Sequence, residues 1–358
     1  MFRCGYHAAV NKRGRNQTEP AKSAISIQDV ADEAHVSIAT VSRVLNNPEV
    51  VSAATAAKVR EVIQRLGYVP NPFAQGLITR ASRVLCLALP DIHGEFYSGL
   101  IRGADAKAHE LGYHLLVSSE ARGGPGATRA ERSTGLALGL IDGLAIMITE
   151  PGDQAWTTAA ESGTPVVLID MEAQRPGVDC VLVDNAVGAA EATRHLLAGT
   201  PAASVFFVGG ASENFDTRAR AEAFASEVGR AGVALPENQI SYGTYNVEWG
   251  YTWMQERVKT GRAVGIGVLA GNDEIAMGIV QAAEDAGIRV PGQVRVVGFD
   301  DTRIASLLRP KLSSVRVPLQ DVGAAAIAAL AARLEDPQRP PSITRLATSL
   351  VVRESSGG

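Results

Sequence analysis

The 358-residue sequence contains no hydrophobic run that approaches the roughly 18 residues of a membrane-spanning helix. Residues 1–24 also lack the apolar segment of a secretory signal peptide. We therefore expect a cytoplasmic protein without a membrane partner. The first 24 residues, which include the basic cluster from Lys12 to Arg15, are expected to form a disordered tail.

Cysteine is scarce in this sequence. The three cysteines, Cys4, Cys86 and Cys180, lie far apart and do not show the close spacing of metal ligands. An odd number of cysteines without a disulfide framework is typical of a reducing compartment. Cys86 and Cys180 fall within apolar runs, so we expect both to be buried in strands. No metal site and no cofactor are predicted.

Signatures of catalysis are also missing. No glycine-rich phosphate loop of dinucleotide or P-loop type follows a strand candidate. No nucleophile elbow with a serine, histidine and aspartate triad is present, and there is no metal cluster. These absences argue against an enzyme, which is the strongest alternative class for a chain rich in α/β patterns. No catalytic residue is predicted.

The most informative stretch is Ile27–Asn46, which reads IQDVADEAHVSIATVSRVLN. Apolar residues recur at helical spacing in its first half, and Ser37 is a favourable N-cap for a second helix. The inner positions of that second helix are apolar, whereas its outer positions are small, polar or basic. Two short helices around a tight turn are typical of a helix-turn-helix, whose second helix reads DNA. An ordinary helical hairpin in a protein core would show the same short pattern.

A third helix and the charge distribution favour DNA binding. Ser52 can cap a helix that ends near Leu66, and Gly67 stands where a glycine often terminates a helix. Residues 1–80 hold ten Lys and Arg against six Asp and Glu, a net charge of +4. Because the whole chain carries −4, the remainder carries −8. A basic N-terminal module on an acidic body fits DNA contact through one end of the molecule.

From Arg83 onward, apolar runs of strand length alternate with helical patterns. Such alternation predicts parallel sheets that are covered by helices on both faces. About 275 residues of this pattern exceed one doubly wound sheet, so we predict two lobes of the periplasmic-binding-protein type. The strand candidates are 84–89, 113–118, 143–148, 166–169, 181–183, 205–208, 264–269 and 294–299. The helix candidates are 100–111, 189–197, 218–229, 249–260 and 274–286.

The order of the short motifs DVA, VS..TVSRVLN, VS, LGYVPN and AQGL resembles the headpiece and hinge of the LacI/GalR family of bacterial transcription regulators. The body adds VLVDN at 181–185, AGNDEIAMG at 270–278 and VGFDDT at 297–302, which resemble the effector-binding core of that family. The resemblance covers nearly the whole chain from residue 25.

The resemblance implies three parts in order. An all-α helix-turn-helix headpiece would span 25–70, a hinge helix 71–82, and an α/β effector-binding and dimerisation domain 83–358. In that domain, one lobe would comprise about 83–182 plus 318–343, and the other about 183–315 plus 346–353.

In the headpiece, the resemblance implies that the outer face of the recognition helix reads bases. Ile38 and Ala39 would come first, because short apolar side chains can meet thymine methyl groups. Ser42 and Arg43 would follow, and Arg43 can reach a guanine edge or a phosphate. Ser37, Thr40 and Asn46 would contact phosphates, although local capping is an equally simple role for Thr40 and Asn46.

The hinge and one turn of the headpiece carry further expectations. Leu77 stands where the family inserts a leucine into the minor groove, which kinks the duplex, and Asn71 is also assigned to DNA contact. Gln75 departs from the arginine of many members, which affects backbone affinity. His35 replaces the usual glycine of the helix-turn-helix turn, so we expect a formed turn with positive φ at this histidine.

The resemblance also implies an effector cleft at strand ends, where open α/β sheets bind ligands. A sugar-like effector requires charged or amide groups that bond its hydroxyls, and an aromatic ring against its C–H face. The matching positions are Arg220, Asn272 and Asp300, with Asp170 opposite them, Tyr245 as the stacking ring, and Asp91, His93 and Phe96 on the first strand–helix loop. Asp273 is expected to be a helix N-cap instead.

These expectations describe a sequence-specific regulator, most simply a repressor, that binds double-stranded, near-palindromic operator DNA as a homodimer. A small molecule, expected to be a carbohydrate, would control its DNA affinity. Two alternatives stay open at this point. The effector could be a purine corepressor, and a periplasmic sugar-binding protein would have similar lobes, although without a basic helical module.

Overall fold

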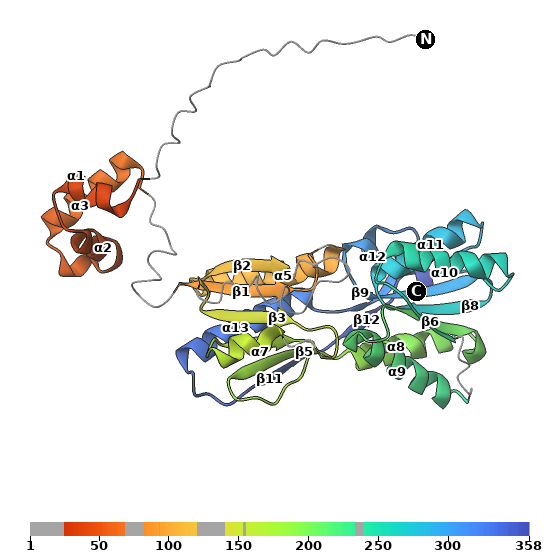
Figure 1. The fold of residues 1–358 in the computed structure, drawn as a ribbon. Helices are drawn as coiled ribbons and strands as arrows, with labels where there is room; N and C mark the ends of the chain where they lie inside the picture. The colour runs from red at the N-terminus through yellow and green to blue at the C-terminus, as the bar shows by residue number, and fades with distance from the viewer. Residues whose placement is uncertain are drawn as a thin grey trace, which may run out of the picture. The chain divides into compact units, whose positions relative to one another are not determined.

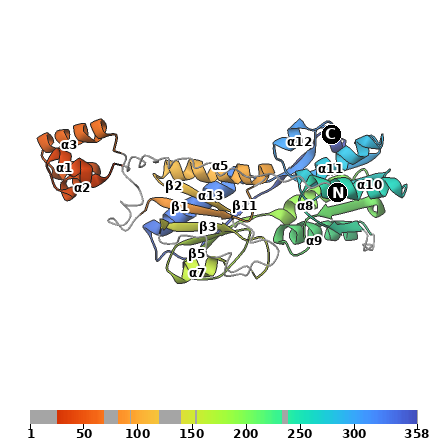
Figure 2. The ribbon, with the colours of Figure 1, turned by 45° about the horizontal axis from the view of Figure 1, so that its top comes forward.

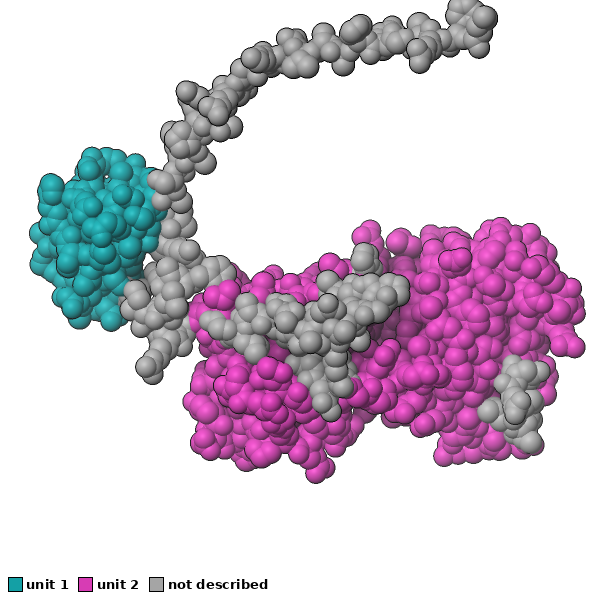
Figure 3. Space-filling view, in the orientation of Figure 1, with its two compact units in different colours: residues 1–75 teal, residues 76–358 magenta. Residues whose placement is uncertain are grey.

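The computed structural model describes residues 25–68, 82–92, 94–119, 140–152, 155–232 and 239–357. The chain divides into two compact units, residues 1–75 and 76–358, which are shown in different colours in Figure 3 and are treated separately below. The predicted tail 1–24, most of the predicted hinge with Asn71 and Leu77, and His93 lie outside the described residues.

The headpiece consists of three helices, α1 (Ile27–Ala34), α2 (Ile38–Asn46) and α3 (Ala53–Leu66), with a short 3-10 turn at Pro48–Val50 (Figure 1). As predicted, Ser37 and Ser52 are N-caps, and each side-chain oxygen accepts a hydrogen bond from the backbone N–H three residues later. The apolar faces of the three helices meet in one core that includes Val30, Val41 and Val59, each fully buried.

Two positions in the headpiece take the left-handed backbone conformation. His35, between α1 and α2, has φ 52° and ψ 47°, which confirms the positive φ predicted for this turn. Its N–H donates to the carbonyl groups at the end of α1, so the turn is closed despite the side chain. Gly67 ends α3 at φ 66°, also as predicted.

The larger unit contains two six-stranded sheets. Sheet A has the order β11-β5-β4-β3-β1-β2, and all its pairs are parallel. Its strands are β1 (Val84–Leu89), β2 (His114–Ser119), β3 (Gly143–Met147), β4 (Val166–Ile169), β5 (Val178–Val183) and β11 (Ile343–Leu346). Sheet B has the order β12-β10-β9-β8-β6-β7 and is parallel except for its β12–β10 pair. Its strands are β6 (Val205–Gly209), β7 (Ile240–Tyr242), β8 (Ile266–Ala270), β9 (Val294–Asp300), β10 (Ser313–Arg316) and β12 (Ser349–Val351).

Helices cover both faces of each sheet, as the figures show from two directions (Figures 1 and 2). On sheet A, α5 (Gly94–Glu110) and α13 (Leu319–Glu335) pack together on one face, and α7 (Ala155–Glu161) lies on the other. On sheet B, α8 (Asn185–Leu197) and α9 (Phe215–Arg230) oppose α10 (Val247–Lys259) and α11 (Asp273–Asp285). A short helix, α12 (Arg303–Leu307), packs near α11. Cys86 and Cys180 are buried strand residues, as predicted.

Some predicted elements differ from the observed ones. The strands β7, β10 and β11 were not predicted, because β7 is short, the Ser313–Ser314 pair in β10 is buried through polar contacts, and β11 is largely exposed. The helix predicted from residue 100 begins at Gly94. Phe96 therefore lies in the first turn of α5 and not in a loop, and its ring packs against the cores of both lobes.

The chain passes between the two sheets three times. It leaves sheet A after β5, returns from sheet B after β10, and crosses again between β11 and β12. No helix in the described ranges is both long enough and apolar enough to cross a membrane. The result of this topology is that carboxyl ends of strands from both sheets contribute to one cluster of polar side chains, described next.

Candidate functional site

The centre of the cluster is Arg220 on α9, which is 3% exposed. Its Nε donates to Asn185 Oδ1 at 2.8 Å, and its Nη1 donates to the carbonyl oxygen of Gly271 at 2.5 Å. The guanidinium carbon lies 3.8 Å from the centroid of the Phe299 ring, a cation–π contact. These contacts come from α8, from the end of β8 and from β9, so the guanidinium is fixed in one place.

Two carboxylates from the same lobe, one on α9 and one at the end of β9, accompany this arginine. Asp216, one turn earlier on α9, lies with Oδ2 3.4 Å from Arg220 Nη2, and its Oδ1 accepts from Asn185 Nδ2 at 2.9 Å. Asp300, at the end of β9, lies with Oδ1 3.8 Å from Arg220 Nη2, too far for a hydrogen bond. Thus Asp216 is held by direct bonds, whereas Asp300 is held near the arginine mainly by charge.

Sheet A contributes Asp170, which follows β4. Its Oδ1 is buried and has no hydrogen-bond partner among the described residues, and the same is true of Asp300 Oδ1. Asp170 is close enough to Asp216, Arg220 and Asp300 for their charges to influence its pKa. The structure therefore brings Asp170, from the end of β4, into the neighbourhood of Arg220 and Asp300.

Burial sets the protonation of these acids. It raises the pKa of Asp300 to about 7, against the opposing influence of Arg220. It also raises the pKa of Asp170 well above its usual range, with a further contribution from Asp216. The pKa of Asp216 is raised by burial too, although Arg220 and Asn185 favour its charged form. Near neutral pH, the cluster therefore holds protons as well as negative charges.

The backbone at these strand ends is strained. Asp170 has φ 63° and Asp300 has φ 95°, and Asp301 follows with φ 50°. Such conformations are unfavourable for residues with a Cβ and are often found at ligand sites. Asp301 is not part of the cluster, because it forms ion pairs with Arg316 at 2.8 Å and Arg353 at 2.6 Å.

Two tyrosines complete the cluster. Tyr245 shares a hydrogen bond of 2.6 Å with Thr217 Oγ1, and burial raises its pKa to about 12. Its ring lies over Gly210, where an added Cβ would overlap the ring. Tyr97, in the first turn of α5, was not predicted. Its pKa is raised by burial and then by the charges of four acids, Asp91, Asp216, Asp300 and Asp170.

The sequence signal for Tyr97 is its position next to Phe96, which was predicted. In the structure the two rings meet edge to face at 5.2 Å. Asp216 and Asn185 were likewise missed. Asp216 is recognisable only after the helix phase places it one turn before Arg220. Asp91, which was predicted, is partly buried and accepts a hydrogen bond from the Ile92 N–H at 2.7 Å.

Asn272 is the N-cap of α11, and its Oδ1 accepts from the Ile275 N–H at 2.9 Å. The prediction that Asp273 is the cap is therefore wrong, because Asp273 is already the first helical residue. Asp273 is instead buried below the cluster, where it accepts from Ser314 Oγ at 2.6 Å and from Thr302 N at 2.7 Å. Burial raises the pKa of Asp273 to about 8.

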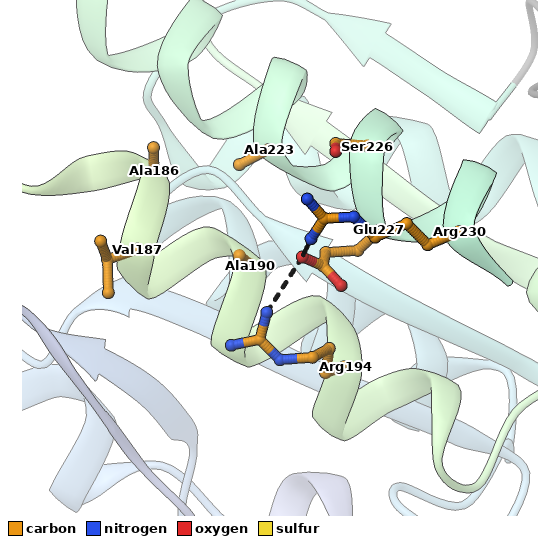
Figure 4. A pocket seen from close by; sticks show the side chains of 8 residues that line it. All are labelled: Ala186, Val187, Ala190, Arg194, Ala223, Ser226, Glu227 and Arg230. Atoms are coloured by element: carbon orange, nitrogen blue, oxygen red, sulfur yellow. Dashed lines mark hydrogen bonds and ion pairs between the residues drawn. The ribbon is translucent and has the colours of Figure 1, made fainter.

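Two cavities lie away from the cluster. One, of about 350 Å³, runs between α8 and α9, and at one end Glu227 is paired with Arg194 at 2.9 Å and with Arg230 at 2.6 Å (Figure 4). The other, of about 370 Å³, is lined by residues 173–176, 178 and 341–343. Within the part of the chain that the structure describes, no group of residues could hold a metal ion.

The outer face of α2 in the headpiece forms a second candidate site. Ile38 is 39% exposed, and Ala39 and Arg43 are also exposed. Ser42 and Thr40 are partly buried, and Ser37 Oγ shares a 2.9 Å hydrogen bond with Thr40 Oγ1. Asn46 is the last residue of the helix. The open face of α2 therefore carries small, apolar and basic side chains.

Comparisons with known proteins agree for both units. Residues 26–71 match the family described as bacterial regulatory proteins of the lacI family, and residues 193–356 match a periplasmic binding protein-like domain. Catabolite control protein A of Staphylococcus xylosus is 33% identical over 303 residues, which cover 84% of this chain and 89% of that protein.

Solved structures extend the similarity over 93% of this chain. The lac repressor dimer bound to operator and the anti-inducer ONPF is 26% identical, with a TM-score of 0.80 and 99% of that chain covered. The complex of the transcriptional regulator CelR with cellobiose is 27% identical, with a TM-score of 0.68 and 100% of that chain covered. These relatives are regulators and not enzymes. With its helix-turn-helix headpiece and its two parallel-sheet lobes, the chain belongs to the lacI family and is a DNA-binding transcription regulator.

Proposed function

We propose that this regulator is a repressor whose affinity for operator DNA is controlled by a carbohydrate bound at the Arg220 cluster. The observation that carries the proposal is the composition of that cluster. Asp170 comes from one lobe and Arg220 and Asp300 from the other, and the two aspartates each keep a buried oxygen without a partner among the described residues. A ligand bonded to both oxygens would connect the two lobes.

The chemistry of the cluster supports a carbohydrate. Hydroxyl groups can donate to the carboxylates and accept from Arg220, while Tyr97 and Tyr245 provide apolar ring surface with polar ends. Asn272 keeps its amide nitrogen for a ligand, because only its Oδ1 caps α11. The cellobiose complex of the CelR relative adds support for this class of ligand.

At the other end of the chain, we propose that α2 enters the major groove. Ile38, Ala39 and Arg43 would contact base edges, with Ser42 behind them, and Ser37 would contact phosphates. Thr40 is already bonded to Ser37, so its capping role is the simpler one. DNA contact by Asn71 and minor-groove insertion by Leu77 remain predictions, because both residues lie outside the described ranges.

We also propose a homodimer on a near-palindromic operator, since two headpieces are needed to read two half-sites. The dimeric lac repressor on its operator supports this arrangement. Effector binding that changes the relation between lobes would change the spacing of the two headpieces. The DNA affinity and the effector affinity are then linked by one coupling free energy.

The test uses DNA that the full-length protein selects from a random pool, and fluorescence anisotropy to measure its affinity with and without sugars. A sugar that controls the protein should change this affinity at least fivefold, the usual lower range of allosteric coupling. Arg220→Ala and Asp300→Asn should abolish the response but retain DNA binding. Arg43→Ala should weaken DNA binding but retain sugar binding in a thermal-shift assay.

A sugar response that survives in both cluster variants would show that the ligand binds elsewhere. A response to purines alone would overturn the carbohydrate class. The unchanged DNA affinity of a matched surface variant, Asp105→Asn on α5, serves as the control, because this residue is exposed.

A further inference from the structure

We infer that the effector carries a positive charge, and that it is a sugar with a protonated amine. This inference rests on the proposed function, since it concerns the ligand of the Arg220 cluster. It depends on a balance of donors and acceptors that can be counted in the described residues. The cluster presents unpaired carboxyl oxygens to a ligand, and its central cation, Arg220, has most of its donors engaged within the protein.

The donors of Arg220 are largely engaged within the protein. Its Nε is bonded to Asn185, its Nη1 to the Gly271 carbonyl group, and its Nη2 lies between Asp216 and Asp300. Of the five guanidinium hydrogens, these contacts use three. The face of the guanidinium group is covered by Phe299. Arg220 therefore acts mainly to hold acidic groups in position: two of its hydrogens remain for a hydroxyl group, but its positive charge is already matched by Asp216 and Asp300.

The acceptors are in excess. Asp170 Oδ1 and Asp300 Oδ1 are buried without a hydrogen-bond partner among the described residues, and Asp300 is only 4% exposed. A buried carboxylate oxygen without a hydrogen-bond donor lowers the stability of the folded protein, because the oxygen has lost its hydration and gained no partner. Because these two oxygens belong to opposite lobes, a single donor group on a ligand would bind both only if it carried more than one hydrogen.

Charge points in the same direction. Three carboxylates, Asp170, Asp216 and Asp300, face one guanidinium group in the described part of the unit. Glu274 and Asp91 add further acidic charge nearby, since Glu274 influences Asp300 and Asp91 influences Glu274. An ammonium group supplies three donors and a positive charge, whereas a hydroxyl group supplies one donor and no charge.

The protonation of the cluster supports this reading. The pKa values of Asp170, Asp216 and Asp300 are all raised, so the site without ligand partly replaces negative charge with protons. A bound cation would lower these pKa values, and protons would leave as it binds. A neutral sugar carries no charge that would lower the pKa values of these acids.

The test uses triples of sugars that differ at one position: glucose, glucosamine and N-acetylglucosamine, and the corresponding galactose and mannose series. Isothermal titration calorimetry of the full-length protein at pH 6.5, where a sugar amine is protonated, gives both affinity and proton release when it is repeated in buffers of different ionisation enthalpy. We expect the amine of at least one triple to bind roughly tenfold more tightly than its neutral partners, with net release of protons.

Asp300→Asn and Asp170→Asn should reduce this preference to less than about threefold, while the surface control Asp105→Asn should retain it. Equal or tighter binding of a neutral sugar would overturn the inference and leave the proposed function intact. If no member of any triple binds to protein that still binds DNA, the carbohydrate class itself is wrong. If an aspartate variant does not fold, the comparison within the triples on the unmodified protein decides, because equal binding of the amine and of its neutral partners contradicts a cationic ligand.

Discussion

At the scale of single residues, the strand ends bear most of the chemistry of this regulator. Asp300 and Asp273 are buried and Asp170 is partly buried, and all three have raised pKa values, yet their surroundings differ. Asp170 and Asp300 keep an oxygen without a partner among the described residues, whereas both oxygens of Asp273 accept hydrogen bonds. The first two are therefore suited to a ligand, and Asp273 is suited to link Thr302, just after β9, to Ser314 in β10.

Asp273 makes the stability of the larger unit dependent on pH. Folding raises its pKa from the ordinary value of 3.8 to about 8. The stabilising contribution of the protonated group is therefore complete below pH 3.8 and is lost as the pH rises through about 8. Asp273→Asn resembles the protonated acid, since the amide can donate to Ser314 and its oxygen can accept from Thr302.

Thermal melts of both proteins between pH 5 and pH 8.5 check this prediction. The melting temperature of the variant should increase relative to that of the unmodified protein as the pH rises, by about 3 °C for each kcal/mol of stability that the unmodified protein loses. A difference in melting temperature that stays constant over this range would contradict the prediction. Asp105→Asn, at an exposed position, should change nothing with pH.

At the scale of elements, sequence patterns predicted what depends on local composition. The apolar strands β1, β3, β4, β6 and β9, the caps at Ser37 and Ser52, and the positive φ of His35 all follow from short-range rules. The polar strand β10 did not, because Ser313 and Ser314 are buried only through partners such as Asp273 and Arg353, which are distant in sequence. Tyr97 and Asp216 were missed for the same reason, since their roles depend on charges that folding brings near.

The turn between α1 and α2 provides a prediction for the headpiece. A residue with a Cβ in the left-handed conformation of His35 is strained by about 1 kcal/mol or more. A glycine at this position would remove the strain, but it would lose more backbone entropy on folding, which offsets part of the gain. His35→Gly should therefore stabilise the headpiece by roughly 0.5 kcal/mol, about a twofold slowing of amide hydrogen exchange in α1 and α2. Asn47→Gly is the matched control, because Asn47 has φ −142° and gains nothing from glycine. Faster exchange in His35→Gly would contradict this account.

At the scale of the whole molecule, charge separates the two binding activities. Residues 1–80 carry +4 and the rest −8, so DNA contact depends on exposed cations, whereas the Arg220 cluster is buried. Screening by salt acts strongly on exposed phosphate contacts and weakly on buried groups.

Raising the salt from 50 to 200 mM should therefore weaken DNA binding at least tenfold and change effector affinity less than about twofold. Anisotropy with the selected DNA and calorimetry with the effector measure the two quantities on the same protein. A neutral osmolyte at equal osmolality is the control for effects other than charge. A parallel loss of both affinities would show that the effector is held by exposed charges.

The three crossings between the sheets have a consequence for the integrity of the molecule. Neither lobe is one continuous segment, because sheet A takes strands from 84–183 and from 343–346, and sheet B takes its strands from 205–316 and from 349–351. A protease that cut one of the crossings would leave the lobes joined by the other two. Neither lobe can therefore be encoded alone by one uninterrupted stretch of gene, and the two lobes must be expressed together as one chain.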